Sequence, residues 1–355
     1  MTRLQVALVG GPMYDGLYEL FGDQVDVVVH ADHPTLNRAV ADRLSRGERL
    51  DVISTHGKYA PSQAQWLHAL DDLLATDAIA ALAPRAVELC RFDGALLCAP
   101  RNIDVRVLWW RTDLLSRAPK TWADVEGADG AFGFTGRESG LFGLFYELMA
   151  ASGSSLFDGG RPTFTGDAAV AAVELLQQLA AKAPDDLPTW HYDDVDRALL
   201  DGRVAMAAAW PGGYDAIRTS TRYPQLAPAP YPGGRSYAGC HAWAIPKTCG
   251  DVDGAVALVE RLCSLEAGRR EAASGGIPAH VTALAEHEPI DETDRERLAI
   301  TRATIDDGML TYPPLVRFPE VEDAAWGALH DALVGTLDAT VAVERMQAAA
   351  EEILG

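Results

Sequence analysis

The sequence predicts an α/β protein of two lobes, each with a doubly wound β-sheet flanked by helices. Short apolar runs alternate with amphipathic segments through the first hundred residues, which is the rhythm of a sheet covered by helices. The length of 355 residues exceeds what one hydrophobic core usually supports, roughly 250–300 residues. Because the chain shows neither an internal repeat nor an obvious linker, we expect it to cross between the lobes more than once, by short strands.

The first lobe begins with alternating strands and helices. We expect strands at residues 4–9, 25–29 and 50–54, and helices at residues 13–22 and 37–46. The valine-rich second run resembles strands that are buried on both faces of a parallel sheet. In such sheets ligands bind beyond the carboxyl ends of the strands. That rule directs attention to residues 10–15, 30–33 and 54–59.

The rest of the chain carries further helix and turn signals. Asp93-Gly94 predicts a two-residue hairpin loop, in which case Cys90 pairs with Leu97 rather than with Cys98. Thr121 is expected to cap a helix, with Asp124 completing a weak capping box. The other expected helices are 62–74, 78–90, 144–151, 167–181, 194–200, 254–264, 291–307 and 322–354. The other expected strands are 105–110, 203–209 and 242–246.

Charge and composition exclude several classes of partner. The formal net charge is −21, which argues against a nucleic-acid partner because phosphate contacts need clustered Lys and Arg. No run approaches the roughly 20 apolar residues that span a bilayer. The apolar run at residues 6–9 is too short for the core of a signal peptide. We expect an extracytoplasmic location if a leader has been removed, and a cytoplasmic one otherwise.

Motifs of common enzymes and metal sites are missing from the sequence. It contains no HExxH spacing and no complete GxSxG elbow, and Gly10-Gly11-Pro12 stands where a dinucleotide site would need GxGxxG. The five cysteines include no CxxC, so a zinc or redox site is unsupported and we expect small buried apolar residues. We therefore expect no enzyme, no metal and no cofactor, although an acid–base pair of carboxylates stays open.

Several segments, in chain order from about residue 50, resemble the extracellular solute-binding protein family 1, the group that contains maltose-binding protein. The resemblance is carried by Asp51-Val52-Ile53-Ser54, by residues 66–73, 94–100 and 106–110, by Arg111-Thr112-Asp113-Leu114-Leu115, by Pro119-Lys120-Thr121-Trp122, by Gly202-Arg203-Val204-Ala205-Met206 with Trp210, and by residues 238–247. Each segment alone is a weak signal, but their common order makes the resemblance specific.

The resemblance implies a type II periplasmic-binding-protein fold with a multi-strand hinge near residues 101–105, 238–242 and 308–312. It implies a first lobe of residues 1–104 and 242–308, and a second of residues 105–241 and 309–355. The implied function is that of the monomeric substrate-binding component of an ABC importer. Such a protein captures a small solute, a sugar or polyhydroxy compound, between its lobes and presents it to permease subunits. A cytosolic ligand sensor of the same fold is the alternative. Iron binding in related folds uses adjacent tyrosines, which this chain lacks.

Sugar sites of this family combine aromatic faces with planar polar groups, and the sequence offers candidates for both. Trp210 matches the stacking tryptophan of the family, whereas Trp326 fits an apolar helix face with Leu329 and Leu333. The candidates in the first lobe are Met13, Tyr14, Asp15, His56, Lys58 and Tyr59, and those at the crossovers are Asn102, Asp104, His241 and Trp243. The candidates in the second lobe are Arg137, Glu138, Trp210, Tyr214 and Arg317.

The arginines leave the charge of the ligand open. If two of Arg101, Arg106, Arg137 and Arg317 faced the cleft, an acidic sugar or small carboxylate would be as well suited as a neutral sugar. The direction in which these side chains point decides between the two ligand classes.

Overall fold

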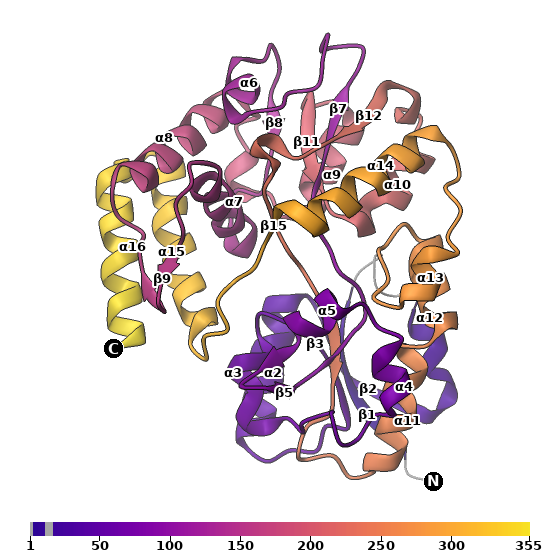
Figure 1. Ribbon diagram of the computed structural model, residues 1–355. Coiled ribbons are helices and arrows are strands. Elements are labelled where there is room, and N and C mark those ends of the chain that lie inside the picture. Colours follow the sequence, from indigo (N-terminus) through magenta and orange to yellow (C-terminus); the bar gives the residue numbers. More distant parts are fainter. Residues whose placement is uncertain (1–2, 11–16) are drawn as a thin grey trace. The chain divides into compact units, whose positions relative to one another are not determined.

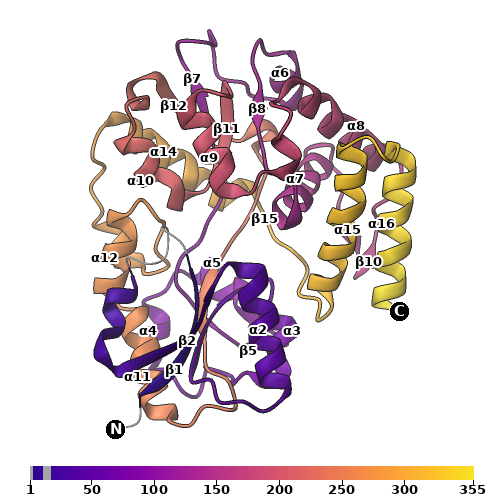
Figure 2. The same cartoon turned by 180° about the vertical axis from the view of Figure 1, so that it is seen from behind.

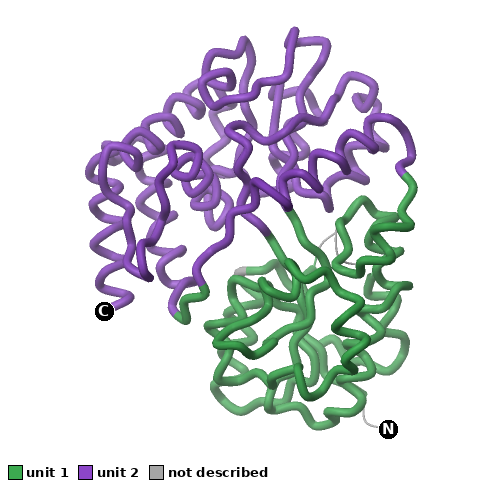
Figure 3. Tube along the Cα trace, in the orientation of Figure 1, with its two compact units in different colours: residues 1–104, 239–288, 314–316 green, residues 105–238, 289–313, 317–355 purple. Residues whose placement is uncertain are grey.

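The computed structural model describes residues 3–10 and 17–355, and the chain divides into two compact units (Figure 1, Figure 3). Unit 1 comprises Met1–Asp104, Gly239–Glu288 and Pro314–Val316. Unit 2 comprises Val105–Ala238, Pro289–Pro313 and Arg317–Gly355. The first crossing lies where the sequence places it. The second falls three residues earlier, and the 289–308 segment, which the sequence division gives to the first lobe, belongs to unit 2.

Unit 1 is built on a mixed sheet with the strand order β2-β1-β3-β14-β6. The strands are β1 (Leu4–Val9), β2 (Val25–Ala31), β3 (Val52–His56), β14 (His241–Ala244) and β6 (Ala99–Pro100). β1 runs parallel to β2 and β3, whereas β14 is antiparallel to β3 and β6. The carboxyl ends of β2 and β3 and the amino end of β14 therefore share one edge of the sheet, where their side chains can form a site.

Strand β2 corrects one expectation. The valine-rich run was expected to be buried on both faces, but β2 is the edge strand and half of the Val27 surface is exposed. The strand has a neighbour on one side only, since β1 is its partner. Composition alone does not distinguish a central strand from an edge strand.

Helices cover both faces of the sheet of unit 1. Figures 1 and 2 show α2 on one side and α11 on the other. The helices of the unit are α2 (His33–Ser45), α3 (Ala60–Gln63), α4 (Thr76–Ala80), α5 (Pro84–Leu89), α11 (Val252–Leu262), α12 (Leu265–Ala273) and α13 (Val281–Ala285), with the 3₁₀ helices η1 (Tyr18–Gln24) and η2 (Ala64–Trp66). The long helices expected at 62–74 and 78–90 are short pieces instead. The second is interrupted before Pro84, which has no backbone N–H to continue a helix.

Unit 2 has a mixed sheet in the order β12-β7-β11-β8. Its strands are β7 (Val107–Arg111), β8 (Phe132–Gly133), β11 (Met206–Ala209) and β12 (Leu226–Ala229). β7 is antiparallel to β11 and β12, and only the β11–β8 pair is parallel, so this sheet is less regularly wound than the sequence indicates. Two short pairs accompany it, β9 (Phe157–Asp158) with β10 (Arg161–Pro162), and β13 (Ser236–Tyr237) with β15 (Met309–Leu310).

The helices of unit 2 gather on two sides of its sheet, with α9, α10 and α14 on one side and α7, α8, α15 and α16 on the other (Figures 1 and 2). They are α6 (Trp122–Gly127), α7 (Glu138–Ala151), α8 (Asp167–Lys182), α9 (Tyr192–Asp201), α10 (Tyr214–Thr219), α14 (Glu292–Ala303), α15 (Phe318–Leu333) and α16 (Ala339–Leu354). Short helical turns are η3 (Leu187–Thr189), η4 (Pro211–Gly213), η5 (Tyr223–Gln225), η6 (Pro232–Gly234) and the π-turn η7 (Thr304–Gly308). The segment 322–354, which was expected to form a single helix, forms part of α15 and all of α16. The connection between these helices contains Gly335, whose φ is 78°.

Two local predictions are confirmed. Asp93-Gly94 forms the two-residue loop between β4 (Arg91–Phe92) and β5 (Ala95–Leu96), with positive φ at both residues, and the Leu97 N–H donates to the Cys90 carbonyl. Thr121 caps α6 in a reciprocal capping box with Asp124. Within the described residues, no helix is long and apolar enough to cross a membrane.

Candidate functional site

Three histidines meet at the shared edge of the unit 1 sheet. His56 ends β3, His241 begins β14 directly opposite it, and His33 begins α2 after β2. Nε2 of His33 and Nδ1 of His241 are 2.9 Å apart, and these two rings are stacked. The His56 ring lies edge-on to both, with centroids 5.3 and 6.0 Å away. His33 falls in the segment 30–33 that the strand-end rule indicated, although it was not among the named candidates.

Burial favours the neutral form of two of the histidines, His56 and His241. Burial, followed by the charge of Lys58, lowers the pKa of His56 well below 6.5. Burial and the other two histidines likewise lower the pKa of His241 well below 6.5. His56 Nε2 accepts a hydrogen bond from the Cys240 N–H at 3.0 Å, and the ammonium of Lys58 lies 4.7 Å from the centre of the Tyr59 ring. Neutral imidazoles and a tyrosine suit neutral hydroxyl partners.

Asn102 and Asp104 form a buried network beside the histidines, as their position at the crossover indicates. The Asn102 amide donates to Asp104 Oδ2 at 2.9 Å, and its carbonyl accepts from the His241 N–H at 3.0 Å. Burial, and then repulsion by Glu271, raises the pKa of Asp104 to about 8. The Asp104 Oδ1 atom is buried without a hydrogen-bond partner among the described residues. Asp104 is therefore mainly a neutral acid at pH 7.

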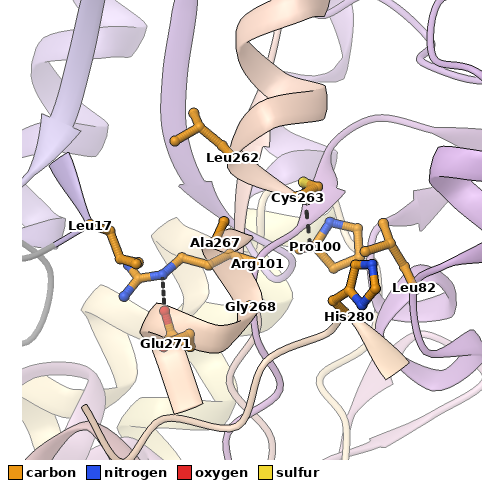
Figure 4. A pocket seen from close by; sticks show the side chains of 10 residues that line it. All are labelled: Leu17, Leu82, Pro100, Arg101, Leu262, Cys263, Ala267, Gly268, Glu271 and His280. Carbon is orange, nitrogen blue, oxygen red and sulfur yellow. Dashed lines mark hydrogen bonds and ion pairs between the residues drawn. The ribbon is translucent and has the colours of Figure 1, made fainter. Parts of the chain in front are cut away.

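The adjoining cavity of unit 1 is too small to bind a solute. Figure 4 shows Arg101 and Glu271 as a buried ion pair in its wall, with Nε and Oε2 2.7 Å apart. Its volume is about 10 Å³, which is room for one water molecule. Nε of Arg101 thus has a carboxylate partner in Glu271.

Unit 2 carries an aromatic group around Trp210, which follows the end of β11. The Trp210 ring packs edge-on to Tyr237 and Tyr192, with centroids 5.0 and 6.1 Å away. The Tyr192 hydroxyl lies 3.1 Å from the Tyr237 hydroxyl and 3.2 Å from Ser139 Oγ, which makes a chain of three hydroxyls. Trp210, Tyr192 and Ser139 are partly exposed. An aromatic face beside a row of donors and acceptors matches the chemistry of a sugar.

A buried ion pair supports this aromatic group from behind. The guanidinium of Arg106 pairs with Glu147 of α7, and both side chains are almost fully buried. The guanidinium carbon also lies 5.0 Å from the Tyr237 ring centre and 5.7 Å from that of Trp210. Glu147 Oε1 accepts from the Tyr237 N–H at 3.0 Å. Arg106 therefore positions the aromatic rings and has its charge already neutralised by Glu147.

The start of α7 brings Arg137 and Glu138 together at the edge of the same unit. Nη1 of Arg137 donates to Oε1 of Glu138 at 2.9 Å, and His191 Nε2 lies 3.3 Å from Oε2 of the same carboxylate. Glu138 has a φ of 56°, a conformation that non-glycine residues rarely adopt. Arg137 is thus paired with a neighbour and does not present an isolated positive charge.

Three of the remaining candidates, Trp243, Tyr214 and Arg317, do not belong to the histidine group of unit 1 or to the aromatic group of unit 2. Trp243 is fully buried against Phe21, and Tyr214 is buried, stacked on Trp109 with its hydroxyl 3.0 Å from that of Tyr223. Both are core residues, because a large aromatic ring serves packing as readily as binding. Arg317 is exposed at the start of α15 and paired with Glu320 at 3.1 Å. Trp326, which was expected to pack on an apolar helix face, is partly exposed beside His330. Met13, Tyr14 and Asp15 lie outside the described residues.

Sequence reasoning missed Tyr192 and Tyr237. Tyr192 starts α9 and Tyr237 belongs to the short strand β13, so neither follows a long strand that would have indicated a site. Their partner Trp210 was found through the family pattern and its position at a strand end before Pro211-Gly212-Gly213. Within residues 3–10 and 17–355, no three His, Cys, Asp or Glu side chains are arranged to hold a metal ion.

Comparison with known proteins identifies the class of protein to which this fold belongs. A family model described as bacterial extracellular solute-binding protein matches residues 22–294. The chain therefore belongs to the bacterial extracellular solute-binding protein family. This membership confirms the resemblance found in the sequence and places the chain among binding proteins rather than enzymes.

Two curated relatives illustrate the spread of the family. A probable amino-acid ABC transporter periplasmic-binding protein of Sinorhizobium fredii is 26% identical over 67% of this chain and 59% of its own length. A maltooligosaccharide ABC transporter solute-binding lipoprotein of Streptococcus pneumoniae is 24% identical over 70% of this chain and 64% of its own length. The chain thus spans about three-fifths of the length of these relatives.

Solved structures share the fold over nearly the whole chain. The solute-binding protein of Thermotoga lettingae bound to α-D-tagatose matches with a TM-score of 0.88 at 19% identity, covering all of both chains. Maltose-bound MalE3 of T. maritima gives 0.85 at 20% identity, with 98% of this chain and 99% of that chain covered. A protein of Agrobacterium radiobacter in complex with ribitol gives 0.85 at 18%, with coverage of 99% and 98%. At this identity the likeness establishes the fold.

Proposed function

We propose that this protein is the substrate-binding component of an ABC importer, and that its ligand is a neutral sugar or another polyhydroxy compound. In this proposal the ligand contacts residues of both units, which close on it by hinge bending and present it to permease subunits outside the cytoplasm. The observation that carries the proposal is the partly exposed aromatic group of unit 2, in which Trp210 stands beside the hydroxyls of Ser139, Tyr192 and Tyr237.

The state of the arginines favours a neutral ligand over a carboxylate. A ligand carboxylate needs a positive group that is not already neutralised, because burying an unpaired charge is costly. Arg101 pairs with Glu271, Arg106 with Glu147, Arg137 with Glu138 and Arg317 with Glu320. These pairings support a polyhydroxy ligand over an amino acid or sugar acid.

The ligands bound in the structural relatives agree with this choice. Tagatose, maltose and ribitol are all neutral polyhydroxy compounds. The relative named for amino acids supplies the competing hypothesis. An amino acid would require a partner for its α-carboxylate, and each of these four guanidinium groups already pairs with a carboxylate of the protein.

The test is a thermal-shift titration against maltose, D-tagatose, ribitol, D-gluconate, L-glutamate and L-proline. A ligand at a hundredfold excess over its Kd stabilises the native state by about 2.7 kcal/mol. We expect the shift with a neutral polyhydroxy compound. A shift confined to gluconate or to an amino acid would overturn the proposed ligand class, and no shift throughout an extended panel of neutral sugars would overturn the importer role in favour of another binding function.

Substitutions in the aromatic group locate the site. Trp210→Ala removes the stacking face, and burial of such a face is worth about 1.5–3 kcal/mol, so we expect affinity by calorimetry to fall about 10- to 100-fold. Tyr223→Phe is the matched control, since its hydroxyl bonds to Tyr214 and Asp291 elsewhere in unit 2. Unchanged affinity in Trp210→Ala would move the site away from this group.

A further inference from the structure

Four of the five cysteines lie buried in unit 1. Cys90 follows α5, Cys98 precedes β6, Cys240 precedes β14 and Cys263 follows α11. Cys263 is directed to the Pro100 carbonyl at 3.8 Å, as Figure 4 shows. Cys90 and Cys240 are in contact, with their Sγ atoms 3.6 Å apart, although 150 positions separate them in the chain. Sequence spacing gave no indication of this pair.

The backbone on both sides of the contact is fixed by hydrogen bonds. The Cys90 carbonyl accepts from the Leu97 N–H at 3.1 Å, which ties it to the hairpin. The Cys240 carbonyl accepts from the Gly57 N–H at 2.8 Å, and its own N–H donates to His56. A disulfide needs the sulfur atoms at about 2.05 Å. Because the sulfur atoms are already in contact, we expect rotation of the two side chains to complete this approach.

We propose that Cys90 and Cys240 are a site of covalent modification. A disulfide forms between them when the protein reacts with an oxidant that is itself a disulfide, R–S–S–R. The thiolate of one cysteine attacks the oxidant R–S–S–R, forms a mixed disulfide and releases RS⁻, which takes up a proton. The thiolate of the second cysteine then attacks the protein sulfur of the mixed disulfide and releases the second RSH. The two cysteines are oxidised by two electrons and the oxidant is reduced to two thiols.

The rate of this reaction is set by burial. Hydrogen bonds with Cys240 and Cys98, together with burial, raise the pKa of the Cys90 thiol well above its usual range, so its thiolate is scarce at pH 7. Cys90 and Cys240 are each 1% exposed. Oxidation therefore proceeds through local opening, over hours rather than seconds, and accelerates at higher pH and in low concentrations of urea.

The topology gives the disulfide a large effect on stability. The chain leaves unit 1 after Asp104 and returns at Gly239, next to Cys240. A bond between Cys90 and Cys240 closes a ring that contains all of residues 105–238. Loop closure of this size removes much entropy from the unfolded chain, so we expect the midpoint of thermal unfolding to rise by on the order of 5–10 °C. The inference does not depend on the identity of the ligand.

The experiment uses the full chain with Cys249→Ser, which removes the one partly exposed cysteine. The protein is incubated with hydroxyethyl disulfide at pH 8.5, alkylated, and digested with trypsin without reduction. Trypsin separates Cys90 (residues 86–91), Cys98 (92–101), Cys240 (236–247) and Cys263 (262–269) into different peptides. We expect a loss of two hydrogen atoms from the intact mass, and a linked pair of the 86–91 and 236–247 peptides.

Matched variants complete the test. Cys98→Ala and Cys263→Ala are expected to retain the bond and the rise in unfolding temperature, whereas Cys240→Ala is expected to lose both. A bond from Cys90 to Cys98, or four free thiols after prolonged oxidation in 1–2 M urea followed by its removal, would overturn the proposal. The sugar titration described above, run on both forms, reports the proposed function separately, because a ligand shift in the reduced form stands whether or not the bond forms.

Discussion

At the scale of single residues, Asp104 is the group whose surroundings most change its chemistry. Its carboxyl is buried beside Asn102, Glu271 and His241, and only one of its oxygens has a hydrogen-bond partner among the described residues. Burial and the carboxylate of Glu271 together favour the protonated form at pH 7. Because the Asp104 carboxyl is protonated, the buried network does not carry a second negative charge next to Glu271.

This state makes the stability of the protein depend on pH. Below about pH 4 the carboxyl is protonated in both folded and unfolded chains. Between pH 4 and about 8 the unfolded carboxyl ionises while the folded one keeps its proton, so stability is lost as the pH rises through this window. Asp104→Asn cannot ionise, and we expect its stability relative to the native protein to increase by up to about 1.4 kcal/mol per pH unit from pH 5 to 8.

Urea denaturation at pH 5, 6.5 and 8 measures this difference. Asp72→Asn, which alters an exposed carboxylate, is the matched control and is expected to follow the native profile. Parallel profiles for Asp104→Asn and the native protein would show that Asp104 is ionised in the folded state.

At the scale of elements, α7 positions the aromatic group of unit 2 through a glycine. A Cβ atom built on Gly143 would lie 2.2 Å from the Tyr237 ring, which is itself buried. The bare helix surface at this position leaves room for the ring, whose hydroxyl lies 3.1 Å from that of Tyr192. The same helix supplies Glu147 to the Tyr237 backbone, so one helix fixes both ends of this residue.

Gly143→Ala is expected to displace Tyr237. Overpacking of this kind costs about 1–3 kcal/mol of stability, and the moved ring weakens sugar binding as measured by calorimetry. Gly327→Ala is the matched control, because Gly327 lies within α15 with nothing near its Cβ position, and there alanine is expected to stabilise by about 0.5–1 kcal/mol. If Gly143→Ala kept the stability and the sugar affinity of the native protein, the Tyr237 ring would have room to move.

The helices, strands and turns also show which features of the fold could be predicted from the sequence. Amphipathic periodicity locates α8 within one residue, and the chemistry of Thr121-Asp124 and Asp93-Gly94 predicts a cap and a turn, because these are local interactions. Edge position and sheet direction depend on partners far along the chain, so the exposure of β2 and the mixed sheet of unit 2 could not be predicted. For the same reason, Trp210 was identified from a family pattern, whereas its partners Tyr192 and Tyr237, separated by 45 positions, were not.

At the scale of the whole molecule, the chain passes between its units at several points. Asp104 and Gly239 pair with each other by two hydrogen bonds of 2.8 and 2.7 Å at the first two crossings, within the ranges expected to form a hinge. The third expected range, 308–312, is replaced by crossings after Glu288, Pro313 and Val316. Short segments without large cores of their own are where a change in backbone angles is least costly, and each unit has a separate sheet.

Closure on the ligand is therefore expected to appear as a change in the shape of the molecule in solution. A ligand that contacts both units favours the closed state by its differential affinity for that state. We expect the radius of gyration from small-angle X-ray scattering to fall on addition of the sugar identified by thermal shift, with a midpoint that follows the calorimetric Kd. In Trp210→Ala the same fall should require about 10- to 100-fold more ligand, by the energetics of the lost ring face. Tyr223→Phe should behave as the native protein. A radius of gyration that stays constant at a saturating concentration would mean that the ligand binds one unit alone, and the aromatic group of unit 2 would then be a complete site without the histidines of unit 1.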